Sequence, residues 1–141
     1  MLCMGLATAS LLGACGQEVS TPERLPTEAS CDPRAMPCLA GTERRGLSLH
    51  LPDNKLRALE PFTVEVRLLG LGAAEVAVEF QMEGMDMGRN RFSLALQGVG
   101  LWAGEAMLPV CWSGRRDWRA TVELSHAEGR RQAEFRFALK G

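Results

Sequence analysis

The sequence predicts an all-β fold. Three observations lead to this prediction: apolar and polar residues alternate along most of the chain, glycine-containing turns recur at short intervals, and no stretch has a helical period. Strict alternation places one face of each strand in a dry core and the other in water, as in antiparallel sheets. About seven short strands at this spacing are typical of an immunoglobulin-like antiparallel β-sandwich.

The expected strands follow one another from residue 46 towards the C-terminus. They cover residues 47–51, 62–68, 76–82, 92–96, 102–108, 118–124 and 133–139. Glycine-rich segments separate several of them, among them Leu69-Gly70-Leu71-Gly72 and Gln97-Gly98-Val99-Gly100, which are typical turn sequences. Trp118 leads one of the strands, and we expect its side chain to be buried against the opposite sheet.

The first residues carry a different signal. Residues 1–14 contain no charged side chain and end in Leu11-Leu12-Gly13-Ala14, directly before Cys15. This pattern resembles a bacterial lipobox, which implies a signal peptide over residues 1–14 and a lipid on Cys15. The apolar run is shorter than the roughly 20 residues that span a bilayer. We therefore expect an exported lipoprotein, held at a membrane of the cell envelope and facing the periplasm or extracytoplasmic side.

Residues 15–45 have the composition of a flexible linker. Prolines at 22, 26, 33 and 37 lie among Ser, Thr, Glu and Arg, with few large apolar side chains. Such a composition buries too little surface to offset the loss of chain entropy. The sequence predicts a disordered tether over residues 15–45 and a β-sandwich domain over residues 46–141. The formal net charge of −1 gives no indication of nucleic-acid binding.

Three cysteines remain beyond Cys15. Cys31 and Cys38 enclose a short loop that contains two prolines, so a local disulfide is the favoured pairing. Cys111 is then a free thiol, either buried and inert or a metal ligand. In the alternative arrangement, Cys111 is bonded to Cys31 or Cys38 and attaches the linker to the domain.

The segment Met82-Glu83-Gly84-Met85-Asp86-Met87-Gly88 lies where one expected strand ends. Thioether sulfurs are soft ligands that favour Cu(I) over harder ions. In an extended backbone Met85 and Met87 lie on the same side, and Met82 or Cys111 could complete a site. Alternatively, these flexible side chains fill gaps at the end of the core.

Two further segments follow the methionines. They are Gly100-Leu101-Trp102-Ala103-Gly104-Glu105-Ala106-Met107-Leu108-Pro109-Val110-Cys111 and Ser113-Gly114-Arg115-Arg116-Asp117-Trp118. Together with residues 85–92 they resemble the FixH and YtkA-like group of small periplasmic β-sandwich proteins, over roughly residues 46–139. The resemblance implies a role in copper supply and cytochrome oxidase assembly, with a protein partner that takes part in copper delivery or oxidase assembly.

No catalytic motif is present in the sequence. It contains no CxxC motif, no phosphate-binding glycine loop and no serine nucleophile elbow, and the two histidines, His50 and His126, lie apart. We therefore expect a protein without enzymatic activity. Two hypotheses remain: a lipoprotein that binds or passes copper, and a structural or assembly module that holds a partner protein at the envelope without a metal.

Overall fold

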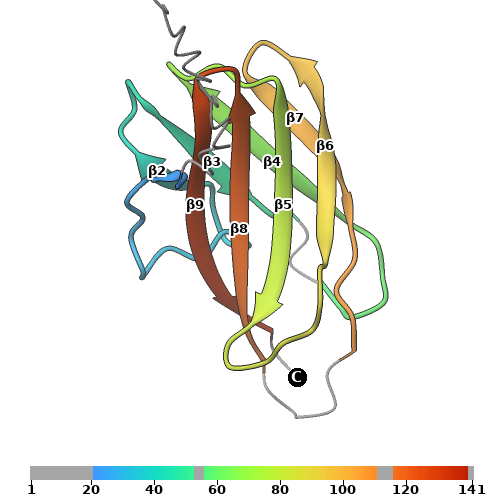
Figure 1. The fold of residues 1–141 in the computed structure, drawn as a ribbon. Coiled ribbons are helices and arrows are strands. Elements are labelled where there is room, and N and C mark those ends of the chain that lie inside the picture. Colours follow the sequence, from blue (N-terminus) through green and yellow to red (C-terminus); the bar gives the residue numbers. More distant parts are fainter. Residues whose placement is uncertain (1–20, 53–55, 111–115, 140–141) are drawn as a thin grey trace, which may run out of the picture.

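The computed structural model describes residues 21–52, 56–110 and 116–139, and these residues form an all-β fold (Figure 1). They contain no helix long and apolar enough to cross a membrane. The nine strands of these described ranges are β1 (Glu23–Arg24), β2 (Cys38–Gly41), β3 (Gly46–His50), β4 (Phe62–Leu69), β5 (Glu75–Met82), β6 (Arg91–Gly98), β7 (Leu101–Ala106), β8 (Asp117–His126) and β9 (Gly129–Ala138).

The strands form a single curled sheet in the order β1-β9-β8-β5-β6-β7-β4-β3-β2. All pairings are antiparallel except the parallel pairing of β1 with β9. Strand β6 joins the two halves, because Arg91 to Leu94 pair with β5 whereas Ala95 to Gly98 pair with β7. In Figure 1, β9, β8, β5 and β6 lie in front of β3, β4 and β7.

The core lies inside the curl and is built from alternate residues of facing strands. Phe80 of β5 is fully buried, and its ring packs edge-on against Phe62 of β4 and Phe137 of β9, with centroids 5.5 and 6.2 Å apart. The indole of Trp118 is only 3% exposed, which confirms its predicted burial. Burying large side chains of this kind is the main favourable term in folding.

The seven strands expected from residue 46 onwards correspond to β3–β9. The predicted inward residues are buried in β4, β5 and β8, in agreement with the alternation. The alternation fails in β6, where Leu94 is buried but Leu96 is 61% exposed. The reason is that β6 leaves β5 after Leu94 and continues beside β7, so its second half runs beyond the core.

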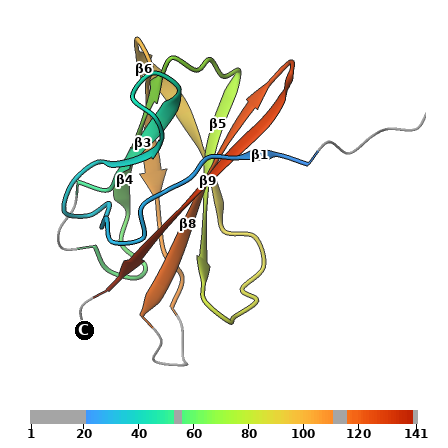
Figure 2. The ribbon, with the colours of Figure 1, turned by 90° about the vertical axis from the view of Figure 1, so that its left-hand side faces the viewer.

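The segment from Thr21 to Arg45 belongs to the fold, so the expected flexible tether does not extend through these residues. Figure 2 shows β1 beside β9 and the following chain crossing towards β3. The backbone N–H of Leu25 donates to Gln132 of β9, while Gly41 of β2 donates to the carbonyl of Pro26. Residues 25–27 therefore bridge β9 and β2 and close the curl, which leaves fewer unpaired edge groups.

A disulfide joins Cys31 and Cys38, the pairing favoured by their spacing. The enclosed loop packs on the domain: Pro33 is buried, and its carbonyl accepts a 2.8 Å hydrogen bond from the Leu51 N–H. The guanidinium of Arg34 lies 5.9 Å from the ring centroid of Phe137. Proline-rich composition therefore accompanies an ordered loop here, because a covalent bond and burial offset the lost chain entropy.

The curled sheet has two ends with different connections (Figure 1). We call one the entry end; it consists of Thr21 and residues 42–45, 70–74, 99–100 and 127–128, which connect β2–β3, β4–β5, β6–β7 and β8–β9. We call the other the methionine end; it consists of residues 56–61, 83–90 and 107–110, and it lies at the bottom of Figure 1.

Candidate functional site

The β5–β6 loop, residues 83–90, begins with a tight turn. The N–H of Met85 donates to the carbonyl of Met82 at 3.3 Å, and Gly84 within this turn has a φ of 72°. Glycine adopts this left-handed conformation without the steric cost that a β-carbon would add. A second local contact follows, in which Asp86 Oδ1 accepts a 3.1 Å hydrogen bond from the Gly88 N–H. The glycines and the aspartate thus shape the loop that carries the methionines.

Hydrogen bonds hold this loop to its neighbours. Gln81 Nε2 donates to the Gly88 carbonyl at 2.8 Å, which ties the loop back to β5. The N–H of Glu83 donates to the carbonyl of Asp117 at the start of β8. Asn90 Nδ2 donates to the carbonyl of Met107, at 3.3 Å, just beyond β7. The loop is therefore attached to three parts of the sheet.

The three methionines differ in exposure. Met82 is the last residue of β5, lies opposite Trp118 in register, and is 3% exposed. Met85 and Met87 are half-buried and pack against the core, whereas Asp86 between them is exposed. The two loop methionines therefore turn inwards. Met82 and Met85 also line one open hollow, which Met87 does not line.

Charged groups surround this hollow in balanced numbers. Its wall contains the carboxylates of Glu79 and Asp86 and the guanidinium groups of Arg89 and Arg119. Two negative and two positive charges give no net repulsion for a monovalent cation. The hollow therefore combines soft sulfur donors with a locally neutral charge, and this donor set fits Cu(I) better than a hard divalent cation.

The other sequence candidates are placed as follows. Cys15 and Cys111 lie outside the described residues. His50 Nδ1 lies 3.7 Å from Glu65 Oε2 on neighbouring strands, and His126 Nδ1 accepts a hydrogen bond from the Glu128 N–H at the entry end. Across residues 21–52, 56–110 and 116–139 no three His, Cys, Asp or Glu side chains gather as a metal cluster.

The tertiary structure adds one sulfur-bearing residue that the sequence motif does not point to. Met107 follows β7 and is 41% exposed, and its carbonyl binds Asn90 at the end of the β5–β6 loop. It lies far from Met82–Met87 in sequence, within a stretch that reads as the continuation of a strand. Only the sheet order, which puts β6 beside both β5 and β7, brings its segment to the methionine loop.

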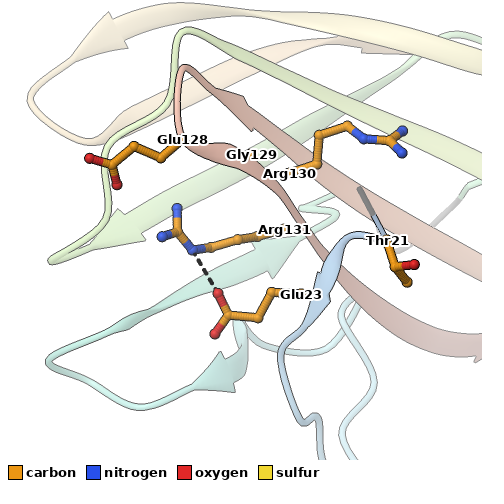
Figure 3. A pocket seen from close by; sticks show the side chains of 6 residues that line it. All are labelled: Thr21, Glu23, Glu128, Gly129, Arg130 and Arg131. Atoms are coloured by element: carbon orange, nitrogen blue, oxygen red, sulfur yellow. Dashed lines mark hydrogen bonds and ion pairs between the residues drawn. The ribbon is translucent and has the colours of Figure 1, made fainter. Parts of the chain in front are cut away.

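A cluster of ion pairs lies at the opposite end of the molecule, in a hollow beside Thr21 (Figure 3). The guanidinium of Arg45 donates to both carboxylate oxygens of Glu23, at 2.7 and 2.9 Å, and Arg131 Nε donates at 3.1 Å. These hydrogen bonds, foremost those from Arg45, lower the pKa of Glu23 to about 2. Glu23 is thus an anion at neutral pH and joins β1, β9 and the β2–β3 turn.

Comparison with known proteins gives the fold without a function. No protein-family model and no curated protein matches the chain. One solved structure, the crystal structure of an engineered protein from the Northeast Structural Genomics Consortium, is similar with a TM-score of 0.50 and 23% sequence identity. The similarity covers 67% of this chain and 20% of that chain, so this chain spans about a fifth of its length.

Proposed function

We propose that this protein is an exported lipoprotein, anchored through Cys15, whose domain binds or passes Cu(I) through methionine sulfurs at the β5–β6 loop. We assign the domain to the immunoglobulin-like β-sandwiches and to the FixH and YtkA-like group. The curled all-β sheet supports this assignment. Its place is the periplasmic or extracytoplasmic face of a membrane, and its task is copper delivery, including delivery for cytochrome oxidase assembly.

One observation carries the copper proposal: Met82 and Met85 line the same open hollow. A buried methionine that only fills space does not need to face a hollow open to solvent. The ligands we propose are Met82 and Met85, with Met87 beside them on the inward side of the loop and Cys111 as a further candidate. Thioethers supply soft donors without titrating, so they hold Cu(I) through polarisable sulfur lone pairs.

The balance of charges supports transfer more than permanent storage. Thioether ligands carry no charge, and the carboxylates and guanidinium groups of the hollow cancel. The ion is therefore held by the sulfur contacts alone. A site of this kind releases Cu(I) to a partner that offers thiolate ligands, since thiolates bind soft cations more strongly than thioethers do. The exchange leaves the oxidation state of the ion unchanged.

Anaerobic titration with Cu(I) against a competing chelator tests the proposal. The double variant Met85→Leu/Met87→Leu keeps the apolar volume, and Leu-for-Met exchanges cost less than about 1.5 kcal/mol in a core. We expect its Cu(I) affinity to fall by at least about tenfold, which corresponds to about 1.4 kcal/mol. Met82→Leu should weaken binding as well.

Met36→Leu is the matched control. Met36 is 56% exposed, lies in the disulfide loop and is not among the residues of the hollow, so its sulfur is available without belonging to the proposed site. Its substitution should leave Cu(I) affinity unchanged. A wild-type protein that does not compete with a weak Cu(I) chelator would end the copper proposal.

A second candidate function, an assembly module that binds a protein partner without a metal, has its own support. Large apolar side chains are exposed at the methionine end: Leu59 is 60% exposed and Val110 42%. Their segments adjoin, because the Leu59 N–H donates to the Leu108 carbonyl. Wild-type levels of partner binding without any Cu(I) affinity would favour this module.

A further inference from the structure

The connections of the entry end lie side by side. Glu23 of β1 binds Arg45 of the β2–β3 turn, and the backbone of Arg44 closely approaches Gly70 of the β4–β5 connection. Strand β4 is in turn attached to the β6–β7 turn, because the Leu68 N–H donates to the Gly100 carbonyl at 2.7 Å. The first described residue, Thr21, is therefore connected through adjacent turns to the tip of the β6–β7 hairpin.

The tip of this hairpin carries an apolar side chain that the fold does not use. Val99 is fully exposed, at 102%, and Leu96 on the same hairpin is 61% exposed. Gly100 forms the turn with a φ of 70°, so the neighbouring position has no need of a valine for turn geometry. The Val99 side chain is therefore available for contact with an apolar environment outside the domain.

Two arginines near the entry end have no carboxylate partner among the described residues. Arg67 pairs in register with Leu101 of the hairpin, and Arg44 lies in the turn whose backbone contacts Gly70. Both side chains are exposed, and no ion pair involves either within residues 21–52, 56–110 and 116–139. A guanidinium group forms paired hydrogen bonds with phosphate oxygens, which are the first groups met at a phospholipid surface.

Chain length sets the distance between this end and the membrane if Cys15 carries the lipid. Six residue steps separate Cys15 from Thr21. At 3.3–3.6 Å per residue, even a fully extended chain spans at most about 22 Å. The methionine end is farther away by the length of β5, whose eight residues rise roughly 26 Å. The anchor therefore keeps the entry end within about 22 Å of the headgroups.

We propose that the entry end rests on the phospholipid surface, with the Val99 side chain in the interface and Arg44 and Arg67 on headgroup phosphates. This inference depends on the lipid anchor of the proposed function and adds an orientation to it. The β5–β6 loop then faces away from the membrane, where a soluble partner has access to its methionines.

Fluorescence in vesicles tests this orientation. The lipidated, signal-cleaved protein is prepared with Cys111→Ser and one new cysteine, labelled with an environment-sensitive dye and reconstituted into vesicles of phosphatidylcholine and phosphatidylglycerol. In Val99→Cys we expect a blue shift of the dye and quenching by brominated lipids. The matched control is Glu60→Cys at the methionine end. Its dye should keep the emission wavelength of an aqueous environment and should not be quenched by brominated lipids.

The outcomes separate the contact from the anchor. A protein that washes off the vesicles overturns the lipid anchor and this inference with it. A protein that stays on the vesicles while the dye at position 99 reports water, as at position 60, overturns the orientation alone. Neither result bears on Cu(I) affinity, which is measured separately.

A charge reversal provides a second measurement on the same labelled protein. Arg44→Glu replaces an unpaired cation of the entry end and should reduce the quenching at position 99. Arg57→Glu, an exposed arginine at the methionine end, is its control and should leave the quenching unchanged. Equal quenching in both variants would show that the arginines take no part in the proposed contact with the membrane.

Discussion

The two ends of the sheet differ in how the chain turns. At the entry end the hairpins β6–β7 and β8–β9 reverse within two residues, and glycine provides the required backbone freedom at Gly100 and Gly129. At the methionine end the β5–β6 connection needs eight residues. Tight hairpins leave no room for a side-chain site, whereas a longer loop supported by a rigid sheet can present one.

The ends also differ in what stabilises them. The entry end is joined by exposed ion pairs around Glu23, and exposed pairs contribute little to the free energy of folding. The methionine end is built over buried side chains, among them Met82 and Trp118. We therefore expect substitutions beneath the methionine end to cost much more stability than substitutions at the entry end, and the following predictions examine this difference.

The largest effect is expected for Trp118→Ala. Trp118 is buried directly opposite Met82, and truncating a buried aromatic side chain typically costs about 3–5 kcal/mol. The free energy of unfolding, measured by chemical denaturation, should fall by this amount. Val99→Ala is the comparison at the entry end, where a loss below about 0.5 kcal/mol is expected for a fully exposed side chain. Equal losses would contradict the difference between the ends.

An intermediate effect is expected for the disulfide, which belongs to neither end and closes the loop of residues 31–38 against the core. For a ring of this size the chain-entropy relation gives a stabilisation of about 2–3 kcal/mol. Cys31→Ser/Cys38→Ser should lower the free energy of unfolding accordingly, and a reductant should then have no further effect. If Cys111→Ser instead abolished the effect of the reductant, the pairing would involve Cys111.

The smallest effect is expected for Glu23→Gln, and it should depend on pH. The pKa of Glu23 is lowered from 4.5 to about 2 by Arg45 and Arg131, so its stabilisation is present above pH 4.5 and is lost as the pH falls towards 2. The variant should be slightly less stable than the wild type at neutral pH and equally stable near pH 2. Glu28→Gln, which removes a carboxylate without an ion pair among the described residues, should show no such dependence.

The sequence predicted β4, β5 and β8 well because each of them buries one face. In β4, β5 and β8 every second residue is apolar, and the same residues are buried in the fold. The prediction failed for Thr21–Arg45, where β1 and β2 are too short to show an alternation. Their order comes from hydrogen bonds to β9 and β3 and from the Cys31–Cys38 disulfide, which composition does not reveal.

The candidate site was found in part. The unusual density of methionines drew attention to Met82, Met85 and Met87 without any knowledge of the fold. Which of these methionines line a common hollow depends on the turn at Gly84 and on contacts with β8, so the grouping of Met82 with Met85 came from the structure. The nearby Met107 was missed because its approach depends on strand order.

By itself, the sequence determined that the described part of the chain is all-β, where its longer strands run and which residues of most of those strands face the core. These properties follow from local alternation, which any extended chain with one dry face must obey. Only the tertiary structure decided the order of the strands, the closure of the curl by residues 25–27, and the separation of the methionine end from the entry end. Those properties depend on pairings between distant residues, and a local pattern does not specify which strand becomes the neighbour of which.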